Sequence, residues 1–241
     1  MADLAKKKIE IFTGRYGKGT PEENQIVELI LGGVETEQRF GIYFHWYNVI
    51  HELGHGIRYF ANEEYRQLSD DFESIEPANL GNIFINEEQL VNDFAVAFWR
   101  YYGESDKLEQ LKIIVNDALT RFERPTDSET THIDYALANF HTEEFQTFNN
   151  YGWFQMSCVA ESLRKNEDLA SVLERMGVDI KVQPQKLLTY PTITEVVVPE
   201  ILDTAVALLR EWGALLPTKI VNHLENDPNR NMCWVTDNEE N

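Results

Sequence analysis

Residues 42–60 read IYFHWYNVIHELGHGIRYF and combine the apolar content of a buried helix with two histidines and a glutamate. His51 and His55 stand four residues apart, so on a helix their imidazoles project from one face, one turn from each other. That spacing suits two of the ligands of a tetrahedral zinc ion. Polar side chains inside an apolar helix need a partner when they are buried. The stretch therefore predicts a helix from about Ile42 to Phe60 with a metal-binding face.

Glu52 lies on the neighbouring face of this helix, where it is suited to proton transfer rather than to binding the metal. Zinc lowers the pKa of a water molecule to about 7 in well-characterised sites, and a nearby carboxylate can accept the proton. We expect one zinc ion per chain and Glu52 as the general base. The competing interpretation is a surface helix with two unrelated histidines, because HExxH also occurs by chance.

A catalytic zinc of this type needs a third protein ligand. The next strong helical pattern, expected from about Glu87 to Tyr102, carries the candidate acids. Glu87 and Glu88 begin it, where acids are also favoured by the helix dipole alone. Asp93 interrupts the apolar run, although it would also fit as an exposed acid between core positions. Periodicity does not decide which of the three faces the metal.

HELGH, followed by the pattern E-x-x-V-N-x-F-A at residues 88–95, resembles the ImmA/IrrE-type zinc metallopeptidases. Their pattern is HExxH and then a helix reading E-x-x-A-N-x-F-A. The likeness covers about residues 40–100. It implies His51, His55 and Glu88 as the zinc ligands and Glu52 as the general base.

Asn92 falls one turn after Glu88, where it could orient a ligand from outside the metal's own coordination shell. Two departures from the family pattern are visible: Val91 replaces alanine, and the helix lacks the usual aliphatic–proline ending.

Peptidases of this kind place a donor opposite the metal to stabilise the oxyanion that develops during the reaction. His132, His141 and Tyr151 are the candidates in the second half of the chain. The alternative is that His141 lies at the surface or caps a helix, and that Tyr151 packs in an aromatic core.

The composition restricts the class of protein. The chain has 241 residues, 43% of them hydrophobic, which is enough for a packed core. A formal charge of −20 would repel phosphates, so nucleic acid is not an expected partner. The sequence contains no apolar run of membrane-spanning length and no secretory signal pattern. With only two cysteines, the sequence indicates a cytoplasmic protein with free thiols.

The predicted fold is mainly α, with a zincin-like helical catalytic core, a helical C-terminal half and at most a small β element. Residues 1–104 form the metal-binding region and residues 105–241 the helical region, which could pack together as one body. Further helices are expected at about 21–31, 105–122, 142–164, 166–176 and 194–212, with a short strand at 82–85 and a frayed end over the last dozen residues.

The predicted function is hydrolysis of peptide bonds in a peptide or protein substrate. The alternative is a catalytically inactive zinc-binding protein that regulates or binds a partner on the same scaffold. The sequence leaves the substrate, the oligomeric state and the identity of the metal in the cell open.

Overall fold

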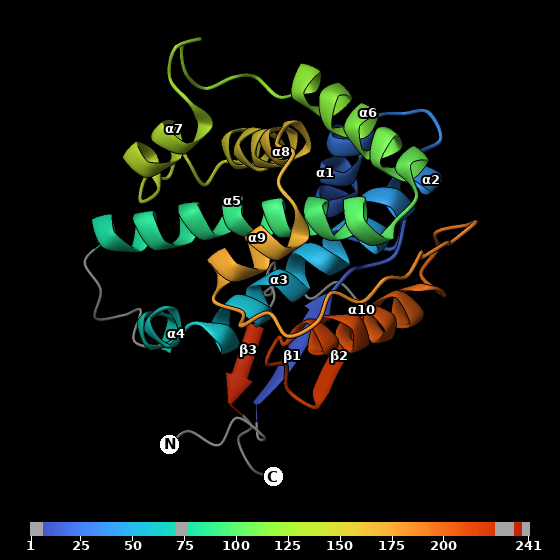
Figure 1. Cartoon of the computed structure of the whole chain (residues 1–241). Coiled ribbons are helices and arrows are strands. Elements are labelled where there is room, and N and C mark those ends of the chain that lie inside the picture. Colours follow the sequence, from blue (N-terminus) through green and yellow to red (C-terminus); the bar gives the residue numbers. More distant parts are fainter. Residues whose placement is uncertain (1–6, 71–76, 225–233, 238–241) are drawn as a thin grey trace.

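The computed structural model describes residues 7–70, 77–224 and 234–237, and these are mainly helical with one small sheet (Figure 1). This agrees with the predicted fold class. Cys233 and most of the last dozen residues lie outside the described part. Among the described residues, no helix has both the length and the apolar character needed to cross a membrane.

The sheet joins the two ends of the described chain. Its strands are β1 (Lys7–Phe12), β2 (Lys219–His223) and β3 (Trp234–Asp237), in the order β2-β1-β3. The central strand β1 pairs parallel with β2 and antiparallel with β3. The last dozen residues were expected to fray, but Trp234–Asp237 form a strand, because the central strand offers them a free edge. None of these three strands was predicted from the sequence.

The first helices begin and end near their sequence signals. Helix α1 covers Pro21–Leu31 and stops at Gly32, whose φ of 71° suits glycine. Helix α2 (Thr36–Phe40) follows and runs into the segment expected to form one helix over residues 42–60.

That segment consists of two different helices. A π-helix, η2 (Gly41–Tyr47), precedes α3 (Asn48–Ala61), which carries the HELGH motif. Trp99 supports the junction, because its indole N–H donates to the carbonyl of Trp46 at 3.0 Å and the two rings stack with centroids 4.3 Å apart. Long π-helices are rare and concentrate at functional sites.

Helix α4 (Glu63–Asp70) is followed by the long helix α5 (Pro77–Tyr102). The predicted strand at residues 82–85 is wrong, because these residues form part of α5. A run of three apolar residues, here Ile83 to Ile85, does not distinguish a strand from a buried helix by its pattern. The helix also begins ten residues before the predicted start at Glu87, and Asn86 lies inside it, where its side chain donates to the Asn82 carbonyl at 2.7 Å.

The remaining helices are α6 (Ser105–Arg121), α7 (His132–Asn139), α8 (Phe148–Arg164), α9 (Leu169–Met176) and α10 (Val198–Trp212). The predicted start of α8 at residue 142 is too early, because Thr147 caps it by accepting from the Asn150 N–H. Asp168 likewise caps α9, so this helix also begins later than predicted. Helix α7 has no counterpart among the predicted elements.

Helix α5 crosses the middle of the molecule, with α3, α8 and α9 packed around it (Figure 1). Its side chains from Val91 to Trp99 are all buried. The hydrophobic core is continuous and takes side chains from both predicted regions, 1–104 and 105–241. The boundary between these regions stays a prediction.

Candidate metal centre

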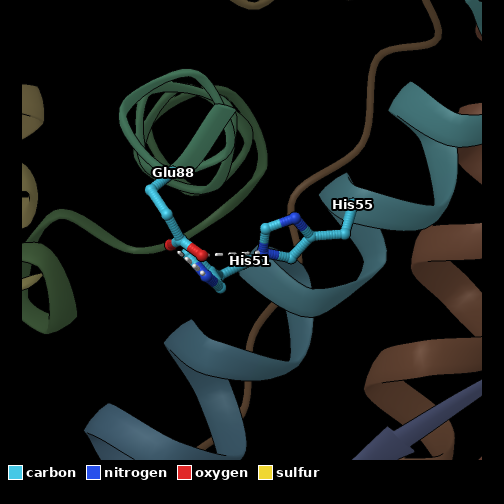
Figure 2. Close-up of side chains that lie close together, drawn as sticks. All are labelled: His51, His55 and Glu88. Carbon is cyan, nitrogen blue, oxygen red and sulfur yellow. Dashed lines mark ion pairs between the residues drawn. The ribbon is translucent and has the colours of Figure 1, made fainter. Parts of the chain in front are cut away.

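Three side chains from two helices converge beside a cleft. His51 and His55 project from α3 toward Glu88 of α5 (Figure 2). The His51 Nε2 atom lies 3.6 Å from one carboxylate oxygen of Glu88, and the His55 Nε2 atom lies 3.7 Å from the other. One ligand atom from each of the three residues lies within 4.8 Å of the other two, an arrangement that could hold a metal ion.

The distances suit a tetrahedral cation. Zinc lies about 2.0–2.2 Å from nitrogen and oxygen ligands, so two ligands of a tetrahedral site are about 3.4 Å apart. The observed separations are close to this value and too long for good hydrogen bonds between the same atoms. Among the described residues, the group has three members, which is the number of protein ligands typical of a catalytic rather than a structural zinc site.

Gly54 lets α5 approach the metal-binding helix. A Cβ atom at this position would lie 2.9 Å from the Phe94 ring and 3.2 Å from Val91. The same argument holds for Gly56, where a Cβ would lie 2.4 Å from Ile9 of β1. The two glycines therefore let α5 and β1 pack closely against α3.

Glu87 binds His55 from the other side of the ring. Its carboxylate lies 2.9 Å from His55 Nδ1, which leaves Nε2 facing the cluster. A carboxylate on the second nitrogen fixes the orientation of a ligating imidazole and raises its basicity. Glu87 therefore holds a ligating histidine without reaching the metal position, whereas Glu88 is itself a candidate ligand.

The two histidines have opposite electrostatic environments. Burial lowers the pKa of His51 to about 4, although Glu88 opposes the shift. Burial also disfavours the charged form of His55, but the hydrogen bond to Glu87 and the charges of nearby carboxylates outweigh it and raise its pKa to about 10. At neutral pH the cluster therefore holds one neutral and one protonated imidazole, and the latter must lose its proton to bind a cation.

Asn92 ties the ligand-bearing turn of α5 to η2. Its side-chain amide donates to the Glu88 carbonyl at 2.7 Å, and its oxygen accepts a hydrogen bond from the Tyr47 hydroxyl. Asn92 is 1% exposed, so these bonds form without competition from water. Asn92 thus lies beside the cluster and positions the backbone that carries Glu88.

Asp93 faces away from the histidines, although it was an alternative third ligand. Its carboxylate accepts from Ser162 at 2.6 Å, from Lys165 at 2.8 Å and from Arg175 at 3.0 Å. Burial raises its pKa, but these bonds outweigh burial and the net shift is downward. The structure thus brings Asp93 to α8 and α9 rather than to the metal-binding face, because it follows Glu88 by five residues and lies on the far side of α5.

Glu52 lies at the cleft beside the cluster. It is half-buried, and the Asn48 amide donates to its carboxylate at 3.3 Å. The cleft has a volume of about 350 Å³ and is lined by His51, Glu52, His55 and Glu88 together with aromatic and aliphatic side chains. A carboxylate therefore borders the space in which a metal and its substrate would meet.

Helix α8 brings residues from the second half of the chain to the same cleft. Tyr151 lines it. His141 is exposed in the turn before the helix, and neither His141 nor His132 of α7 is among the lining residues. Gln155, which the sequence analysis missed, donates to Glu88 at 3.0 Å and to the Tyr151 hydroxyl at 2.8 Å. Its only signal in the sequence is its position one helical turn after Tyr151.

A comparison of the chain with family models, with curated proteins and with solved structures found no match. The resemblance to the ImmA/IrrE-type metallopeptidases thus stays a prediction based on residues 51–55 and 88–95.

Proposed function

We propose that the protein is a zinc-dependent metallopeptidase. One observation carries this proposal: His51, His55 and Glu88 converge at a cleft that Glu52 also lines. The donor set of two imidazoles and one carboxylate is a known set for catalytic zinc. The buried environment and the Glu87–His55 contact support the same function, because they fix ligand geometry before a metal arrives.

A zinc ion bound there would supply Lewis acidity, acidifying a water molecule and polarising the carbonyl of the substrate. Glu52 would accept the proton from the attacking water and return it to the leaving amine. Asn48 restrains the Glu52 carboxylate through its amide, so the base does not have to be ordered at the moment of reaction.

Tyr151 would donate a hydrogen bond to the oxyanion of the transition state. Burial and the nearby charge of Glu88 raise its pKa well above the ordinary value, so the hydroxyl keeps its proton. Gln155 donates to the Tyr151 oxygen, which leaves the hydroxyl proton available to the substrate.

The test combines metal content with turnover. Zinc-loaded wild type, Glu52→Gln and the control Glu64→Gln, which changes an exposed carboxylate on α4, are incubated with a peptide library, and cleavage is followed by mass spectrometry. Glu52→Gln should retain zinc and lose at least about 100-fold in turnover, while Glu64→Gln should behave as wild type. Undiminished cleavage by Glu52→Gln would refute the assigned role. A zinc-loaded wild type that cleaves nothing would favour the inactive, regulatory alternative.

A further inference from the structure

One wall of the cleft carries no charged side chain. We call it the apolar wall and define it as Ile26, Val27 and Ile30 of α1, Phe40 of α2, Phe44 of η2 and Phe148 of α8. Ile26, Val27, Phe44 and Phe148 are only half-buried, so apolar surface faces the open cleft. Binding pockets are typically lined in this way, with a few polar groups that orient the ligand.

The apolar wall is continuous with the metal cluster. Tyr43 and Tyr47 line the cleft between them and share one side of the helix with His51, at intervals of four residues. The Tyr43 ring contacts the Phe44 ring at a centroid distance of 4.9 Å, and the Tyr47 ring lies 6.3 Å from the His51 ring. A group held at the wall would therefore be next to a group held at the cluster.

The charged side chains that line the cleft do not belong to the apolar wall. Glu52, Glu88 and the protonated His55 lie at the metal cluster, and Arg15, which pairs with Glu195 at 3.6 Å, also lines the cleft. The formal charge of the chain is −20, and a wall without acids is notable on such a surface. A charged side chain at this wall would lose water without gaining a partner, which is unfavourable, whereas an apolar one would gain by burial.

We infer that the apolar wall is a specificity site for a large aliphatic or aromatic side chain of a peptide, adjacent to the bond that the metal cluster would cleave. That a bond is cleaved beside this site rests on the proposed function, whereas the binding of the side chain does not. The substrates would then be peptides that carry leucine, phenylalanine or a similar residue on one side of the cleaved bond.

The experiment measures binding separately from cleavage. Four tetrapeptides, capped at both ends, are titrated into the full chain with and without zinc. They differ only in one inner residue, which is leucine, phenylalanine, aspartate or lysine. The variant Val27→Lys puts a charge on the apolar wall, and its half-buried position allows the lysine to reach solvent. The control Gln25→Lys makes the same change of charge at an exposed position of α1 outside the cleft.

We expect the leucine and phenylalanine peptides to bind at least about tenfold more tightly than the other two. Val27→Lys should remove this difference and Gln25→Lys should retain it. Equal binding, a preference for a charged peptide or no binding of any peptide would overturn the inference. If the preference is present but zinc-loaded wild type leaves all four peptides uncut, the proposed function fails and the specificity site stands.

Discussion

Replacing Asp93 with asparagine separates the role of this acid from that of Glu88. Asp93 is 4% exposed, and its carboxylate accepts bonds from Ser162, Lys165 and Arg175. Removing one partner of a buried ion pair costs about 3–5 kcal/mol. Here the side chains of Lys165 and Arg175 are 33% and 44% exposed and remain solvated in the variant, so the cost is smaller. We expect the free energy of unfolding to fall by about 2–3 kcal/mol.

For a chain of this size, each kcal/mol lowers Tm by about 2–4 °C, so Asp93→Asn should melt roughly 4–12 °C below wild type. Circular dichroism measures the melting, and elemental mass spectrometry measures the zinc content of the same samples. Asp93→Asn should keep its zinc and Glu88→Gln should lose it. The control Asp203→Asn changes an exposed acid of α10 and should alter neither quantity. Loss of zinc from Asp93→Asn, or an unchanged Tm, would refute the reasoning.

Three further predictions concern the cluster and its support. Burial opposes the charged form of His55, but Glu87 and neighbouring carboxylates raise its pKa to about 10, so zinc must displace a proton. Zinc affinity should therefore increase with pH by up to about tenfold per pH unit between about pH 7 and 9. Calorimetry in two buffers of different ionisation enthalpy should detect the released proton. A zinc affinity that is independent of pH would contradict this prediction. Glu87→Gln should weaken zinc binding about 10–100-fold, whereas Glu64→Gln, at an exposed position, should not; competition with a chelator measures both. Gly54→Ala should lower the free energy of unfolding by about 1 kcal/mol, because crowding outweighs the gain in helix propensity. In a double-mutant cycle, Gly54→Ala combined with Phe94→Leu should show favourable coupling. If the two changes in unfolding free energy simply add, α3 and α5 are less tightly packed than described.

Local sequence patterns were sufficient to predict several helices and the two histidines of the metal site. Pro21 and Gly32 mark the ends of α1, and the four-residue spacing of His51 and His55 fixes their common face. These features depend on residues within one or two helical turns of each other. They were predictable because the helix itself sets the relative positions.

The choice between Glu87 and Glu88 depends on tertiary structure. Neighbouring residues on a helix differ by about 100° in direction, and both acids turn out to be buried and to contact His55, on different ring nitrogens. Only the packing of α5 on α3 decides which one approaches both histidines. The contribution of Gln155 could not be predicted for the same reason, because Gln155 lies 67 positions further along the chain than Glu88.

The misjudged elements have a common cause. The segment 82–85 was assigned to a strand from three consecutive apolar residues, whereas its helical state depends on the burial of Ile85 and on the stacking of the Phe84 ring on the Phe140 ring. The strand β1 was overlooked because its partners are more than 200 residues away in the sequence. Pairing between the two ends of a chain leaves no short-range signal.

The most direct test of the account is the zinc content of protein purified without added metal and then offered one equivalent of zinc. Elemental mass spectrometry is applied to wild type, to His55→Ala and to the control His141→Ala, which removes an exposed histidine outside the cleft. Wild type and His141→Ala should each contain close to one zinc per chain, and His55→Ala should lose most of its zinc. No zinc in the wild type, or equal zinc in all three proteins, would contradict the metal centre and the peptidase proposal with it.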